Sequence, residues 1–122
     1  MADKREHKFI TYKGKEILYV DYRNLIPETF LEVIPQAHHF IMNSGKKDIL
    51  ELVDITGSFG NDKVMEELKR TALESQALIK KRAVVGVTGV KKILLNALSN
   101  FTKEKILAFN TVEEALEYLS GD

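Results

Sequence analysis

The sequence ILELVDI at residues 49–55 is nearly continuous in apolar side chains, and three of its seven residues are β-branched. A run of this length and composition is typical of a central strand in a parallel sheet that is covered on both faces. Turn-forming residues follow at once, in the sequence TGSFGN at residues 56–61. The pattern therefore predicts an α/β protein in which this strand leads through a loop into a helix.

Strand-like and helix-like segments alternate on both sides of this run. Upstream, strands at 9–12 and 17–22 flank a turn glycine, and a helix begins at Pro27 and ends near Asn43. Downstream we expect helices at 62–80, 93–101 and 111–119 and strands at 83–87 and 106–109. The order β-β-α-β-α-β-α-β-α predicts a mixed, mostly parallel sheet with flanking helices. We expect one domain over residues 1–122, with residues 1–8 frayed.

Composition excludes several functional classes. The chain has 122 residues, 44% of them hydrophobic, and no cysteine, so thiol catalysis and cysteine-based metal sites are absent. Eighteen basic residues balance eighteen acidic residues, and no overall field favours nucleic acid or an anionic membrane. The polar N-terminus and the lack of a long apolar run predict a cytoplasmic protein without membrane insertion. A neutral surface is compatible with a homo-oligomer.

Polar side chains follow the predicted strands at their carboxyl ends, where ligands usually bind in parallel sheets. Asp21 and Asp54 could be paired acids or metal ligands, but an aspartate at a strand end more often caps the following loop, and we favour capping. We expect no metal and no cofactor. The candidate ligand-binding residues at this edge are Asp54, Thr56, Ser58, Thr88, Gly89 and Lys91.

The sequence GVTGVK at residues 86–91 leads from a strand into a helix. Free backbone N–H groups and Lys91 could hold a phosphate or carboxylate there. The spacing matches neither a nucleotide-binding P-loop nor a dinucleotide fingerprint. We favour the alternative, in which Gly86 packs a strand against a helix and Gly89 makes a turn.

A partner surface is predicted at the start of the 62–80 helix and in the loop before it, with Phe59, Asn61 and Lys63 as its candidate residues. A large apolar side chain in a loop either folds back onto the sheet or remains out for a partner. For Phe59 we expect folding back. Asn61 or Asp62 should also cap the helix.

Four segments resemble the STAS-like group related to bacterial anti-sigma factor antagonists, in particular its small stand-alone members. They are ILYVDY (17–22), LVDITG (52–57), KRAVVGVTGVKKI (81–93) and FNTVEEALEYL (109–119). The resemblance covers residues 9–119 and implies a mixed sheet with flanking helices. It also implies a non-enzymatic role in binding proteins or small ligands, lipids among them.

In anti-sigma factor antagonists a kinase phosphorylates a serine at the start of the helix after the central strand. The resemblance places Lys63 at that serine's position, which argues against the same switch here. Ser58 and Thr56 lie in the preceding loop and are the candidate phosphosites.

Three functions remain open at this point. We expect first a non-enzymatic regulatory module that binds an unidentified protein partner. The alternative is a carrier of a small acidic or lipid-like ligand, held at Thr88, Gly89 and Lys91. An Asp54-dependent enzyme acting on phosphate with a metal ion is the least favoured, since one or two aspartates do not make a metal cluster.

Overall fold

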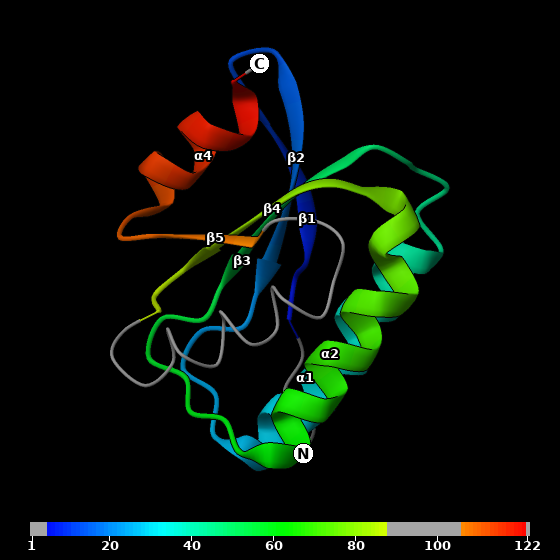
Figure 1. Ribbon diagram of the computed structural model, residues 1–122, viewed down its shortest axis with the longest axis vertical. Helices are drawn as coiled ribbons and strands as arrows, with labels where there is room; N and C mark the ends of the chain where they lie inside the picture. The colour runs from blue at the N-terminus through cyan, green and yellow to red at the C-terminus, as the bar shows by residue number, and fades with distance from the viewer. Residues whose placement is uncertain (1–4, 88–105, 122) are drawn as a thin grey trace.

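The computed structural model describes residues 5–87 and 106–121, and in this part of the chain a five-stranded sheet has the order β1-β2-β3-β4-β5 (Figure 1). β1 is antiparallel to β2, whereas the other neighbouring pairs are parallel. The prediction of a mixed, mostly parallel sheet is confirmed. The strands are β1 (Lys8–Tyr12), β2 (Lys15–Asp21), β3 (Ile49–Asp54), β4 (Ile79–Val85) and β5 (Ile106–Phe109).

Helices cover the two faces of the sheet (Figure 1). α1 (Pro27–Met42) and α2 (Asp62–Ser75) pack against each other on one face, and α4 (Val112–Ser120) lies on the opposite face. The helix predicted at 93–101 lies outside the described residues. Within the described residues, no helix is long and apolar enough to span a bilayer.

Local sequence explains where the helices begin. Pro27 occupies the first turn of α1, where a missing backbone N–H costs nothing. The Asn61 side chain accepts a hydrogen bond from the Val64 N–H at 3.0 Å and caps α2. Thr111 does the same for Glu114 at 3.1 Å and caps α4. Both predicted caps are confirmed.

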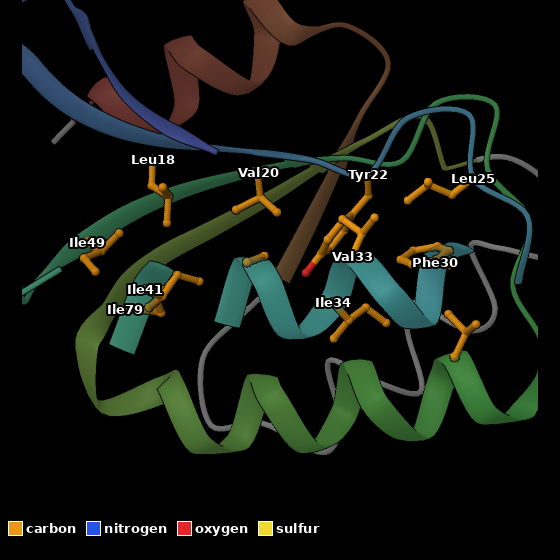
Figure 2. Close-up of a cluster of buried hydrophobic side chains, with 12 residues drawn as sticks. Leu18, Val20, Tyr22, Leu25, Phe30, Val33, Ile34, Ile41, Ile49 and Ile79 are labelled. Carbon is orange, nitrogen blue, oxygen red and sulfur yellow. The ribbon is translucent and has the colours of Figure 1, made fainter. Parts of the chain in front are cut away.

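The core follows from the alternation of side chains along the strands. Leu18, Val20 and Tyr22 of β2 point toward α1, where they meet Val33 and Ile34 (Figure 2). On the other face, a second buried cluster joins the sheet to α4. Its fully buried members are Ile17, Leu52, Ala83, Ala115 and Leu119.

The boundary between α2 and β4 differs from the prediction. The helix expected to reach Lys80 ends at Ser75, a 3-10 turn covers Gln76–Leu78, and β4 begins at Ile79 instead of Ala83. The charged run Lys80-Lys81-Arg82 does not look like a buried strand in sequence. Its inclusion is explained by Arg82, which is buried in the sheet and paired with an acid on β3.

The N-terminal residues that the structure describes are held against the sheet, so the expected fraying does not extend to residues 5–8. Arg5 donates to the Asp21 carboxylate at 3.1 Å. The His7 ring is 8% exposed and lies near the rings of Tyr22 and Phe40, with ring centroids 6.1 and 6.4 Å away. β1 follows directly at Lys8.

Candidate functional site

The loops after β2 and β3 form one interlocked edge at the carboxyl ends of the strands. Residues 22–26 and 55–61 run side by side toward the lower left of Figure 1. The backbone N–H of Asn24 donates to the Thr56 carbonyl at 2.9 Å, and that of Phe59 donates to the Leu25 carbonyl at 2.8 Å. Backbone bonds between loops hold their side chains in fixed positions, as a binding surface requires.

Two glycines make the close approach of these loops possible. Gly57 has φ +77°, and a Cβ there would lie 2.2 Å from the side-chain oxygen of Asn24. Gly86, after β4, has φ +92°, and its Cβ would lie 2.6 Å from backbone atoms of Thr56. Gly86 therefore serves packing, but against the loop after β3 and not against a helix as predicted.

Asp54 is buried and caps its own loop, as the sequence favoured. Its carboxylate accepts hydrogen bonds from the Thr56 hydroxyl at 2.6 Å, the Thr56 N–H at 3.1 Å and the Tyr19 hydroxyl at 2.8 Å. Burial, together with the hydrogen bond to Asp54, raises the pKa of Tyr19 above its ordinary value. Both carboxylate oxygens of Asp54 are engaged by the protein.

Asp21 is the register partner of Asp54 on the neighbouring strand. It accepts from the Arg23 backbone and Nε, each at 3.0 Å, and from Arg5 at 3.1 Å. Burial raises the pKa of Asp21, but the hydrogen bonds from Arg23 outweigh it and hold that pKa below the ordinary value. No group of three or more acidic or histidine ligands suited to a metal occurs among the described residues.

Ser58 is a buried structural residue. Its side chain is 2% exposed, accepts from the Leu25 N–H at 2.9 Å and donates to the Tyr22 carbonyl. A kinase or a ligand would reach this hydroxyl only after the loop had left the sheet, which opposes the predicted roles of Ser58. Thr56 is exposed as a residue, although its hydroxyl donates to Asp54.

Phe59 does not fold back onto the sheet, so that prediction is wrong. Its side chain is 64% exposed, and Ile26 at the start of α1 is 55% exposed. The bond from Phe59 N–H to Leu25 carbonyl sets these two apolar residues on adjacent loops, and we call them the edge patch. Phe59 projects outward because Ser58, the residue before it, occupies the buried position.

The other two predicted partner residues have different positions. Asn61 spends its side-chain oxygen on capping α2. Lys63 lies in the first turn of α2 and is exposed, in agreement with its expected place at a helix start.

A cavity that the sequence did not reveal lies between the sheet and helices α1 and α2. Its volume is about 140 Å³ as bounded by described residues. The lining is largely apolar, but Glu51 and Arg82 form a buried ion pair on its sheet side. The alternation of Glu51 with Leu50 and Leu52 could have indicated an inward-facing acid in a strand. Residues that line the cavity include Val20, Tyr22, Val53, Val64, Leu68, Ala72 and Val84.

Three predicted ligand residues, Thr88, Gly89 and Lys91, lie outside the described residues. The described end of their strand is fixed to the neighbouring loop, because the Ile55 N–H donates to the Val85 carbonyl at 2.9 Å. The structure therefore brings Asp54, Thr56 and Ser58 together at one edge.

The chain is similar in structure to an uncharacterized DUF3478-family protein with a SpoIIAA-like fold from Shewanella loihica PV-4. The TM-score is 0.70 with 17% sequence identity, over 98% of each chain. Neither a protein-family model nor a curated protein matches this sequence. The chain thus has a SpoIIAA-like fold, and the resemblance to STAS-like proteins is confirmed at the level of fold.

Proposed function

We propose that this protein is a non-enzymatic regulatory module that binds a protein partner through the edge patch formed by Ile26 and Phe59. The observation that carries the proposal is the exposure of two large apolar side chains on loops locked together by backbone hydrogen bonds. A large apolar residue on a loop adds little to the core and is the kind of side chain that dominates binding energy at interfaces.

The surroundings of the patch support binding more than catalysis. Ser58 and Asn61, on either side of Phe59, fix the loop through buried and capping hydrogen bonds. Little conformational freedom is then lost when a partner covers Phe59, which favours affinity. The carboxylates of Asp21 and Asp54 are occupied by hydrogen bonds from the protein, so they offer no vacant pair for acid–base chemistry.

A pair of matched probes tests this proposal in the protein's host. A photo-crosslinking amino acid replaces Phe59 in one chain and Met42 in the other, because Met42 is also exposed, at 46%, but lies at the far end of α1. We expect a discrete cross-linked protein only with the probe at position 59. The partner is then purified, and its dissociation constant is measured by calorimetry.

The affinity measurement compares Phe59→Ser with Met42→Ser. We expect Phe59→Ser to weaken binding by about 2 kcal/mol or more, as for a residue that dominates an interface. Met42→Ser should leave the dissociation constant unchanged. Equal cross-linking from both positions, or unchanged binding by Phe59→Ser in a folded protein, would overturn the proposal.

The cavity favours a second candidate function, the binding of a small apolar molecule. Its volume of about 140 Å³ resembles that of engineered apolar cavities that hold benzene, so a ring-sized ligand fits better than a lipid chain. Native mass spectrometry of protein from its host should then show a small added mass. Ala72→Leu, which fills the cavity, should remove that mass, whereas its persistence in the variant would place the ligand elsewhere.

A further inference from the structure

A second pocket lies at the opposite edge of the sheet, where the parallel strands begin. Its volume is about 300 Å³, and it lies between the β1–β2 turn, the loop before β3, the start of β4 and the end of α4. These segments all lie in the upper part of Figure 1. The pocket brings together five lysines from three separate parts of the chain: Lys15, Lys46, Lys47, Lys80 and Lys81.

This pocket concentrates positive charge in a protein whose net charge is zero. Five lysines line it against two acids, Glu16 and Asp48, which leaves an excess of three positive charges among the described lining residues. A concave surface lined by one sign of charge focuses the field and raises the local concentration of counter-ions. The overall neutrality of the chain therefore conceals a strongly basic site.

Two of the lysines are held in place by the protein. Lys46 pairs with Glu16 at 2.8 Å, and its ammonium lies 4.9 Å from the centre of the Phe9 ring. Lys81 donates to the Gly121 carbonyl at 2.8 Å and the Tyr118 carbonyl at 3.3 Å at the end of α4. Carbonyl groups orient the Lys81 ammonium without cancelling its charge, so one wall of the pocket is preorganised and cationic.

An irregularity in β4 contributes a further lysine to the same wall. Ile49 pairs with Ile79 and Leu50 pairs with Lys81, so Lys80 is an extra residue opposite β3. Consecutive residues of a regular strand face opposite sides of the sheet. Both Lys80 and Lys81 nevertheless line the pocket, and bulges re-aim side chains in this way at functional sites.

Lys47 and Lys80 are the exposed members most available to a ligand. In the part of the chain that the structure describes, neither forms an ion pair. The described lining contains no arginine, so the planar, paired hydrogen bonds that suit a carboxylate are not provided. Several ammonium groups act instead as point charges, which suit the oxygens of phosphate.

We propose that this lysine pocket binds a small soluble anion that carries two or more phosphate groups. The volume lies at the lower end of the range for small-molecule sites, and the excess of positive charge matches a di- or triphosphate group. The site is at the other edge of the sheet from Ile26 and Phe59, so it does not depend on the proposed protein-binding function.

Calorimetric titration with inorganic tripolyphosphate at low salt tests the proposal. We expect saturable one-site binding that weakens as salt is added, because exposed ionic contacts are screened. The variant with Lys47→Gln and Lys80→Gln should bind roughly tenfold more weakly, as expected for the loss of two such contacts. A control with Lys8→Gln and Lys69→Gln changes the net charge equally on other surfaces and should match the parent protein.

Circular dichroism melts must first show that both double variants are folded. An equal loss of affinity in the two double variants, or binding without saturation, would overturn the proposal. So would binding to vesicles of phosphatidylserine and phosphatidylcholine without binding to tripolyphosphate, since the ligand would then be a membrane surface. Phe59→Ser should retain tripolyphosphate binding, which separates this site from the edge patch.

Discussion

The guanidinium of Arg82 on β4 donates to the carboxylate of Glu51 on β3, beneath α2, with both side chains about 5% exposed or less by residue. Arg82 also donates to the Ser75 hydroxyl at 3.2 Å, at the last residue of α2. The pair thus joins two strands to the end of a helix from inside the protein. Two buried charges are stable here because each supplies the partner that water would otherwise provide.

Removing one member of this pair should be strongly destabilising. We expect Glu51→Gln to lower the free energy of unfolding by about 3–5 kcal/mol, because the buried guanidinium would lose its counter-charge. Replacing both residues, with Glu51→Leu and Arg82→Met, should restore most of that loss. Urea denaturation of the single and double variants measures the difference, and a double variant less stable than the single one would contradict this account.

Ser58 should contribute to stability and not to phosphorylation. Ser58→Ala leaves the Leu25 N–H and the Tyr22 carbonyl without a protein partner, at a cost of roughly 1–3 kcal/mol for buried groups. Thermal denaturation followed by circular dichroism measures this loss. Intact-mass analysis of protein from its host should find no phosphate on Ser58, and a stoichiometric phosphoserine there would show that the loop opens.

Gly86 and Gly14 offer a matched comparison, since both have positive φ, +92° and +79°. Gly14→Ala meets no atom within 4 Å and should cost only the backbone strain, about 1–2 kcal/mol. Gly86→Ala adds a clash with the Thr56 backbone and should cost at least 2 kcal/mol more, or roughly the upper range of single substitutions. Equal midpoints of urea denaturation for the two variants would argue against the close packing of these loops.

His7 should make the fold sensitive to mild acid. Burial is the largest influence and lowers the pKa of His7, while Asp21 and Glu51 oppose the shift and Arg5 adds to it. The unfolded chain, with a histidine pKa of about 6.5, then binds more protons than the folded chain as pH falls. The His7 contribution to stability is complete above that pH and declines from there toward the lower folded-state pKa.

Protonation would also remove the Nδ1 acceptor that receives the Asp21 N–H at 3.3 Å. Urea denaturation between pH 7.5 and 5 measures the slope. His7→Leu should flatten it, because no titrating group remains at the buried position. His39→Gln alters an exposed histidine and should keep the slope of the parent protein.

Much of the fold was predictable because its signals are local. The apolar run at 49–55, the turn glycine at 14 and the caps at 61 and 111 each depend on neighbouring residues, and all lie where the sequence places them. The start of β4 was missed for a non-local reason. Arg82 becomes a strand residue through Glu51, which is 31 positions away in the chain.

The candidate site was predictable in position but not in detail. Pattern placed Asp21, Asp54 and the 56–61 loop at one edge and favoured capping by the aspartates, which the hydrogen bonds confirm. Which of Ser58 and Phe59 faces inward depends on contacts with Tyr22 and Leu25, more than 30 residues earlier. The lysine pocket was hidden for the same reason, since its charges come from distant segments.

The interlocking of the 22–26 and 55–61 loops ties the edge patch to the completion of folding. Ile26 and Phe59 become neighbours only after β2 and β3 have paired in the register that sets Asp21 opposite Asp54. A slip of one residue would turn each side chain of a strand to the other face and separate the loops. A partner that recognises this patch would therefore discriminate correctly assembled molecules from misfolded ones, which gives the interaction a built-in quality control.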